Sequence, residues 1–155
     1  MFYTKTMQWT QPGYTVTTDV DSFDFEVIHR YLSEVAYWSL GVPRATVERA
    51  TRNSLAFGLF EADHQIGFAR LITDLTTFAY LSDVFVLPDY QGKGLGTWFM
   101  ECVFAHPELE GMRRLMLVTG DAQKLYEKFG FTALANPEQV MEKRPQATLR
   151  PAQRS

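Results

Sequence analysis

The spacing of hydrophobic residues and the positions of helix-ending residues predict four helices. Phe25, Ile28, Leu32 and Val35 follow one another at intervals of three and four residues, which places their side chains on one face of an amphipathic helix. Ser22 is the expected N-cap of this helix, because serine side chains accept hydrogen bonds from the first helical N–H groups. The other helices are expected over residues 44–52, 94–106 and 121–128.

Runs of β-branched and aromatic residues between these helices predict strands. The strands are expected over residues 14–18, 54–61, 65–72, 78–87 and 114–118, with a final pair over 131–134 and 139–143. The short apolar run over 114–118 is typical of a central strand. Because adjacent strands and helices are mixed along the chain without a regular strand–helix repeat, the pattern favours an α/β sandwich of the α+β type.

Length and composition narrow the class of protein. The 155 residues, 46% of them hydrophobic, suit one folded domain, expected over 1–143, with a flexible C-terminal tail over 144–155. A net charge of −3 disfavours a nucleic-acid partner. The sequence shows no apolar run of the kind that predicts a signal peptide or a membrane span. A cytoplasmic protein is therefore expected. Cys102 is the only cysteine and the histidines lack ligand spacing, so no metal site is predicted.

The densest chemical signal is a glycine-rich segment between a predicted strand and a predicted helix. Residues 91–96 read Gln-Gly-Lys-Gly-Leu-Gly. Glycines let the backbone approach a ligand, and the unpaired N–H groups of the following helix favour an anion, most naturally a phosphate or pyrophosphate. Lys93 adds a positive charge. A glycine-rich turn without a ligand is the alternative.

Two common phosphate-binding patterns do not fit this segment. A dinucleotide fingerprint needs a third glycine where Thr97 stands, and a P-loop needs serine or threonine where Gly94 follows Lys93. A third pattern, Gln or Arg, two residues, Gly, one residue, then Gly or Ala, matches residues 91–96 in full.

A second motif lies downstream, where residues 122–131 read Ala-Gln-Lys-Leu-Tyr-Glu-Lys-Phe-Gly-Phe. With both motifs in this order and separation, the chain resembles the GNAT superfamily of N-acetyltransferases, which transfer acetyl from acetyl-CoA to an amine. The resemblance covers roughly residues 14–143. It implies a three-layer sandwich with a mixed, mostly antiparallel central sheet flanked by helices, and acetyl-CoA as co-substrate without a metal.

The resemblance also implies which residues hold acetyl-CoA. The backbone of Phe85 and Val86 would pair with the pantetheine arm, and the loop amides with Thr97 would hold the pyrophosphate. Many family members carry asparagine where this chain has Thr119, whose hydroxyl would take its place. The implied contacts are Phe85, Val86, Gln91, Gly92, Lys93, Gly94, Leu95, Gly96, Thr97, Thr119 and Ala122.

Two residues are candidates for the chemistry. Tyr126 matches the tyrosine that commonly protonates the departing CoA thiolate, and the alternative is a half-buried packing role. Asp83, on the strand before the loop, is the best candidate for the base that accepts the proton of the amine. A structural hydrogen bond or an outward-facing charge is the alternative for Asp83.

The segment between the first two helices often selects the substrate in this family. Tyr37 and Trp38 would stack on a ring or surround an ammonium group, and Tyr80 would face the same cleft; a cap on the core is the alternative. The expected acceptor is a primary amine of a small molecule or peptide, and a homodimer is one expected assembly. A non-catalytic acyl-CoA sensor and a nucleotide-binding enzyme remain alternative functions.

Overall fold

The computed structural model describes residues 4–145. These residues form two compact units, one ending at Gly120 and one beginning at Asp121. The expectation of a single domain over 1–143 therefore stays a prediction. Residues 146–155, which make up most of the predicted tail, lie outside the described residues.

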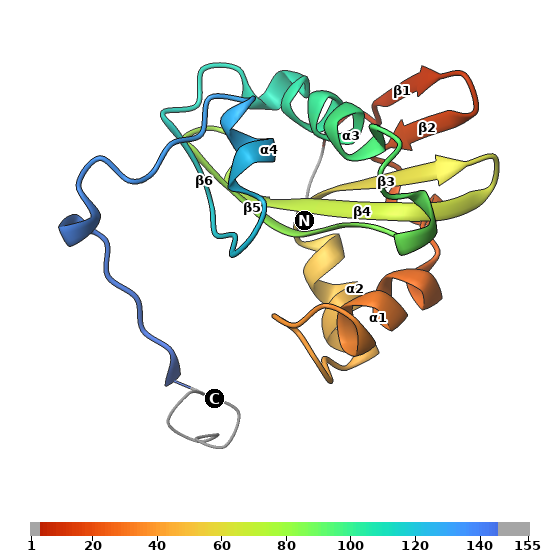
Figure 1. Ribbon diagram of the computed structural model, residues 1–155, viewed down its shortest axis with the longest axis horizontal. Helices are drawn as coiled ribbons and strands as arrows, with labels where there is room; N and C mark the ends of the chain where they lie inside the picture. The colour runs from red at the N-terminus through yellow and green to blue at the C-terminus, as the bar shows by residue number, and fades with distance from the viewer. Residues whose placement is uncertain (1–3, 146–155) are drawn as a thin grey trace. The chain divides into compact units, whose positions relative to one another are not determined.

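The first unit is built on a six-stranded sheet whose strands are neighbours in chain order (Figure 1). Its strands are β1 (Gln8–Gln11), β2 (Tyr14–Thr17), β3 (Leu55–Glu61), β4 (His64–Thr73), β5 (Phe78–Val86) and β6 (Arg114–Leu117). The first five pair antiparallel, and β6 runs parallel to β5. The mixed, mostly antiparallel sheet is confirmed.

Helices cover both faces of this sheet. In Figure 1, α1 (Phe25–Glu34) and α2 (Arg44–Arg52) lie on one face, and α3 (Leu95–Phe104) lies on the other. Short 3₁₀ turns follow three of these elements: η1 (Val20–Ser22) comes after β2, η2 (Pro88–Tyr90) after β5 and η3 (Pro107–Leu109) after α3. This arrangement is the three-layer sandwich that the sequence predicts.

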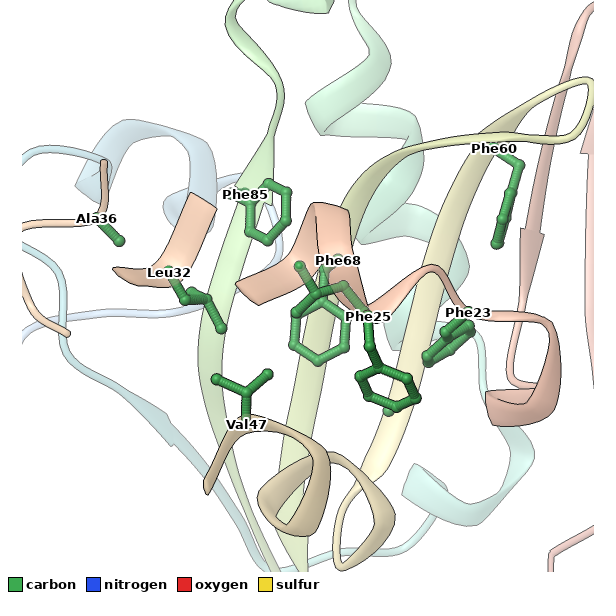
Figure 2. Close-up of a cluster of buried hydrophobic side chains, with 10 residues drawn as sticks. Phe23, Phe25, Leu32, Ala36, Val47, Phe60, Phe68 and Phe85 are labelled. Carbon is green, nitrogen blue, oxygen red and sulfur yellow. The ribbon is translucent and has the colours of Figure 1, made fainter. Parts of the chain in front are cut away.

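The core between the sheet and α1 follows from the predicted apolar face. Phe25, Ile28 and Leu32 are buried, and they pack with phenylalanines of the strands, including Phe68 and Phe85 (Figure 2). Val35 differs from the prediction because the helix ends at Glu34, which leaves Val35 54% exposed at the C-cap.

The start of α1 also differs from the prediction. Asp24, not Ser22, is the N-cap, and its carboxylate accepts hydrogen bonds from the N–H groups of Glu26 and Val27. Ser22 instead closes the preceding turn, where its hydroxyl donates to the carbonyl of Asp19. Both residue types are good caps, so local sequence alone does not choose between them.

Strand β1 was not predicted, because three of its four residues are polar and the prediction began at Tyr14. As an edge strand, β1 pairs with β2 alone among the described residues. Its one large apolar side chain, Trp9, lies 6.2 Å between ring centroids from both Phe57 of β3 and His106. One aromatic side chain with two ring contacts therefore helps to hold a strand that otherwise looks like a polar loop.

Two predictions about the last third of the chain were wrong. Strand β6 is not central but last in the sheet order. An apolar run does not separate a central strand from a parallel edge strand with partly covered faces. The final strand pair is also absent: residues 128–145 contain turns, among them η4 (Pro137–Gln139), and no strand. Leu134, Val140 and Met141 are exposed there, so a ladder would have no buried face to stabilise it.

His106 is a buried histidine that the structure holds in its neutral form. Its Nδ1 atom accepts a hydrogen bond from the N–H of Glu108 at 3.1 Å, which places the proton on Nε2. The Nε2 atom is buried without a polar partner among residues 4–145, and the ring lies edge-to-face with Phe57. Burial lowers the pKa of His106, and Glu108 opposes this effect.

The lowered pKa of His106 predicts a loss of stability in acid. The unfolded chain takes up the proton near pH 6.5, before the folded protein does, so stability falls as the pH drops below this value. The limiting slope for one proton is about 1.4 kcal/mol per pH unit. His106→Asn keeps an acceptor for Glu108 and cannot titrate. Urea unfolding between pH 7.5 and 5 should therefore show a steeper decrease for the wild type than for the variant, and equal slopes would contradict this assignment.

Candidate active site

Strands β5 and β6 pair over only part of the length of β5. Their pairing ends at Leu81 and Leu117, whereas β5 continues to Val86. The N–H of Leu87 donates to the carbonyl of Ile66 on β4 at 2.8 Å. Neighbouring residues of a strand point their N–H and C=O groups to opposite sides. Because Leu87 points toward β4, the N–H and C=O groups of Val86 point away from β4. The last five residues of β5 therefore present an edge that β6 does not cover.

A β-bulge interrupts β5 within this uncovered edge. Arg70 of β4 pairs with Ser82, and Phe68 pairs with Phe85, so Asp83 and Val84 lie opposite a single residue. Asp83 adopts a left-handed backbone with a φ of 57°. Aspartate tolerates this conformation better than most residues, and bulges often aim side chains beside active sites.

The carboxylate of Asp83 is bound on both oxygens. One oxygen accepts from Nε of Arg70 at 2.7 Å, and the other accepts from Nε1 of Trp38 at 2.9 Å. Arg70 also donates to the hydroxyl of Ser54 at 3.0 Å. The two charged side chains are only 16% and 14% exposed. These two hydrogen bonds give Asp83 a structural role and leave one lone pair on each oxygen. Its role as a general base stays a prediction.

The glycine loop leads from β5 into the N-terminus of α3. Gln91 braces its start: its side-chain amide donates to the carbonyl of Val86 at 2.8 Å, and its N–H donates to that of Pro88. Gly92 and Gly94 have φ values of 79° and 78°, which a residue with a Cβ rarely adopts. The Gln91 side chain thus shapes the loop, and it bonds to the carbonyl of Val86, a residue whose backbone is predicted to pair with pantetheine.

The first turn of α3 fits an anion. Gly94 is the N-cap and offers no side-chain cap. The first helical hydrogen bond runs from the N–H of Trp98 to the carbonyl of Gly94, so the three preceding helical N–H groups have no acceptor within the helix. A Cβ added at Gly92, Gly94 or Gly96 would meet no atom within 4 Å. Open space, unused donors and the positive end of the helix dipole all favour a bound phosphate.

Lys93 is held beside this turn by an interaction that the sequence analysis missed. Its ammonium group lies 5.3 Å from the centre of the Tyr90 ring, and the Tyr90 hydroxyl donates to Glu61 at the end of β3 at 2.8 Å. The hydrogen bond to the Glu61 carboxylate raises the pKa of Tyr90. An aromatic residue just before the glycines is the only sequence signal for this link.

Phe85 and Leu95 lie on either side of the loop with buried side chains. The ring of Phe85 stacks on Tyr31 of α1, with centroids 4.1 Å apart. The side chains of Phe85 and Leu95 therefore do not face a ligand, and the backbone of Phe85 points toward its partner Phe68 on β4, so its predicted contact with a ligand stays a prediction. Thr97, at the third position of α3, is partly buried.

The predicted substrate residues fall into one exposed cluster and one strand position. The rings of Tyr37 and Trp38 meet edge-to-face at 5.2 Å and are 65% and 46% exposed. Tyr80 of β5 pairs with Ile72 of β4, two positions before Ser82. Side chains two residues apart in a strand share a face, so Tyr80 and Ser82 point to the same side of the sheet. Trp38 is brought to Asp83 by its hydrogen bond.

The second unit contains the predicted acid. Tyr126 lies in α4 (Gln123–Glu127), which is shorter than the predicted helix, and Ala122 is its N-cap residue. The Tyr126 side chain is buried, and its ring meets Phe131 edge-to-face at 6.1 Å. Burial, followed by the charge of Asp121, raises the pKa of Tyr126 to about 12. Its hydroxyl therefore keeps a proton at neutral pH.

Three further features bear on the chemistry and location of the site: the single thiol, metal-ligating side chains and apolar helices. Cys102 is buried in α3, and burial raises the pKa of its thiol to about 11, which makes it a poor nucleophile. Residues 4–145 contain no group of three metal-ligating side chains. Within the same range, no helix combines the length and apolar composition needed to cross a membrane.

Comparison with known proteins agrees with this fold. Residues 52–133 match the model of an acetyltransferase (GNAT) domain. A Gibberella zeae protein named as a candidate acetyltransferase is 33% identical over 147 residues, covering 81% of this chain and 82% of that protein. The chain therefore belongs to the GNAT family of acetyltransferases.

Solved structures extend the comparison. A candidate GNAT-family acetyltransferase from Xanthomonas campestris is 45% identical, covers 87% of this chain and 95% of its own, and superposes with a TM-score of 0.84. A Clostridium acetobutylicum structure, described as an acetyltransferase with acetyl-CoA, has a TM-score of 0.58 at 14% identity and covers 84% and 94% of the two chains. The second likeness shows the fold alone.

Proposed function

We propose that the protein is an acetyl-CoA-dependent N-acetyltransferase whose acceptor is a primary amine of a small molecule or peptide. The observation that carries the proposal is the N-terminus of α3, where unused N–H groups and open space lie beside Lys93. Acetyl-CoA supplies a thioester and a pyrophosphate, and this turn fits the pyrophosphate.

Different residues of the chain bind the pyrophosphate and the pantetheine arm of acetyl-CoA. The N–H groups of residues 92–97 and the ammonium of Lys93 bind the pyrophosphate, and Gln91 keeps the loop in shape. The outward-facing N–H of Val86 would contact the pantetheine arm, and Thr119 and Ala122 are the further contacts that the family resemblance implies. The side chains of Phe85 and Leu95 hold these segments in the core.

The proposed chemistry is direct attack of the amine on the thioester: the nitrogen bonds to the carbonyl carbon as the carbon–sulfur bond breaks, and the proton that the nitrogen loses passes to water. Tyr126 keeps its hydroxyl proton at neutral pH, gives it to the leaving thiolate and regains a proton from water. Cys102 is buried with a raised pKa, which argues against an acyl-enzyme on this thiol. Positioning the two substrates together supplies a large part of such an acceleration.

One observation favours a second candidate, a non-catalytic acyl-CoA sensor. Asp83, the predicted base, is bound by Arg70 and Trp38. A protein that only binds acyl-CoA needs no base. The two candidates differ in turnover, not in binding.

The deciding experiment combines binding with turnover. Acetyl-CoA should raise the melting temperature, and a panel of aryl, alkyl, amino-acid and peptide amines should include one that releases free CoA thiol. The buried Cys102 keeps the background of a thiol reagent low. Stabilisation by acetyl-CoA without thiol release from any amine would support the sensor. A response to nucleotides with none to acetyl-CoA would contradict both candidates.

A further inference from the structure

We propose that Arg70 and Asp83 are positioning residues that hold Trp38, and through it Tyr37, as an aromatic wall of the acceptor site. This inference rests on the proposed function, because it assigns a role to the surface where the amine binds. It replaces the expectation that Asp83 acts as a free base with a role that its contacts support.

The anchor of this wall is a nearly buried ion pair on the sheet. Arg70 projects from β4 and uses two nitrogens of its planar guanidinium, one on Asp83 and one on Ser54. These two contacts fix the orientation of the guanidinium. The bulge and the left-handed backbone at Asp83 fix the carboxylate in turn. The pair is therefore rigid compared with an exposed salt bridge.

The anchor is connected to the segment between α1 and α2. Trp38 is 46% exposed, yet its indole N–H is bonded to the remaining oxygen of Asp83. Tyr37 packs its ring edge-to-face on Trp38. A Cβ added at Gly120 would lie 3.1 Å from the Tyr37 hydroxyl, so this hydroxyl lies against the segment that follows β6.

The segment thus contacts β5 and the residues that follow β6, beyond the point where the two strands stop pairing. Trp38 touches β5 at Asp83, and Tyr37 reaches Gly120, three residues after the end of β6. The last paired residues are Leu81 and Leu117. The two aromatic rings therefore line the uncovered edge of β5 on the face that carries Arg70.

The charge balance of the anchor determines what this wall offers a ligand. Arg70 compensates the charge of Asp83, so the wall presents aromatic surface without an unpaired carboxylate. Such a surface favours the apolar or aromatic body of an amine over a highly charged one. The wall would act on the affinity for the acceptor and leave acetyl-CoA binding unchanged.

The first test observes the anchor without relying on activity. In the ¹⁵N-labelled protein, the three tryptophans give three indole N–H resonances, and Trp38→Phe identifies that of Trp38. Asp83→Asn keeps the backbone tolerance but disturbs the ion pair, and Arg70→Lys removes the two-point contact. Each should shift the Trp38 resonance and speed its hydrogen exchange at least tenfold. An unchanged Trp38 resonance in both variants would overturn the proposal.

A second pair of variants tests the contact at Gly120. Gly120→Ala should displace the Tyr37 hydroxyl and shift the Trp38 resonance, because the added Cβ is too close. Adding Tyr37→Phe removes the crowded oxygen and should return the resonance toward that of Tyr37→Phe alone. A shift that persists in the double variant would mean that the crowding does not act through Tyr37.

Kinetics separates positioning from base catalysis. With the best amine from the panel, Trp38→Phe and Asp83→Asn should both raise the KM for the amine about three- to tenfold. The KM for acetyl-CoA and the pH profile of kcat should stay as in the wild type. A base at Asp83 would instead lower kcat in Asp83→Asn and remove an ionisation from its pH profile, while Trp38→Phe kept the wild-type KM. That outcome would overturn the proposal.

The experiments distinguish an error in the proposed aromatic wall from an error in the proposed function. If no amine releases thiol, the proposed function fails, while the resonance of Trp38 still decides whether Arg70 and Asp83 hold it. If an amine reacts and the Trp38 resonance ignores both anchor variants, the enzyme stands and the wall is wrong.

Discussion

Replacing Gly94 with glutamate is expected to abolish measurable binding of acetyl-CoA. Gly94 has a φ of 78° and is the N-cap of α3, so a larger residue there strains the backbone by about 1–2 kcal/mol. The added carboxylate stands where the helix dipole and the unused N–H groups attract an anion, and it repels the phosphates. We expect the Kd, measured by calorimetry, to rise at least about 100-fold, which corresponds to about 2.7 kcal/mol.

A matched control separates the loop from general strain. Gly111 also has a left-handed backbone, with a φ of 83°, and open space around it, but it lies after α3. Gly111→Glu adds the same charge and a similar strain at another place and should leave acetyl-CoA binding near the wild-type value. Similar losses in both variants, or retained binding in Gly94→Glu, would show that the loop is not the seat of the pyrophosphate.

Local patterns predicted the parts of the fold that depend on neighbouring residues. The helix α2 and the strands β3, β4 and β5 lie within a residue or two of their predicted bounds, because their apolar spacing reflects a buried face. Strand β1 was missed because its place depends on the contact of Trp9 with Phe57, 48 positions along the chain. The false final strand pair shows the reverse case, in which suitable residues lack a buried face to pack on.

The candidate site also has features that the local sequence predicts and features that depend on distant residues. The glycine loop could be predicted, since three glycines and a helix start carry their physical meaning locally. The partners of Asp83 could not: Arg70 is 13 positions away and Trp38 is 45. The bulge that aims Asp83 arises from the register of two strands, and the apolar pattern of one strand does not reveal it. The sequence therefore shows an acidic residue before the loop but not the ion pair and the indole contact that hold it.

Replacing Tyr126 with phenylalanine is expected to lower turnover about 100-fold while leaving the affinity for acetyl-CoA nearly intact. General acids contribute about 10²–10⁴-fold, and the substitution removes only the hydroxyl that carries the proton. Because the ring remains, its edge-to-face contact with Phe131 and the buried position are kept. Thiol release under saturating substrates measures turnover, and calorimetry measures binding.

The raised pKa of Tyr126 adds a second measurable consequence. The active form is the protonated phenol, so activity due to Tyr126 declines only as the pH rises toward its pKa of about 12. An unperturbed tyrosine would already lose half of its protonated form near pH 10. Ultraviolet titration of the wild type against Tyr126→Phe should accordingly assign the missing phenol to the highest-pH part of the curve.

A control tyrosine decides whether the effect is specific to Tyr126. Tyr14→Phe removes a hydroxyl from β2 and should leave turnover unchanged. Unchanged turnover in Tyr126→Phe, with acetyl-CoA still bound, would remove Tyr126 as the acid without affecting the assignment of the loop. A parallel loss of turnover and of acetyl-CoA affinity would instead mean that Tyr126 supports the binding surface, because loss of a proton donor to the leaving group lowers kcat and kcat/KM equally and leaves binding unchanged.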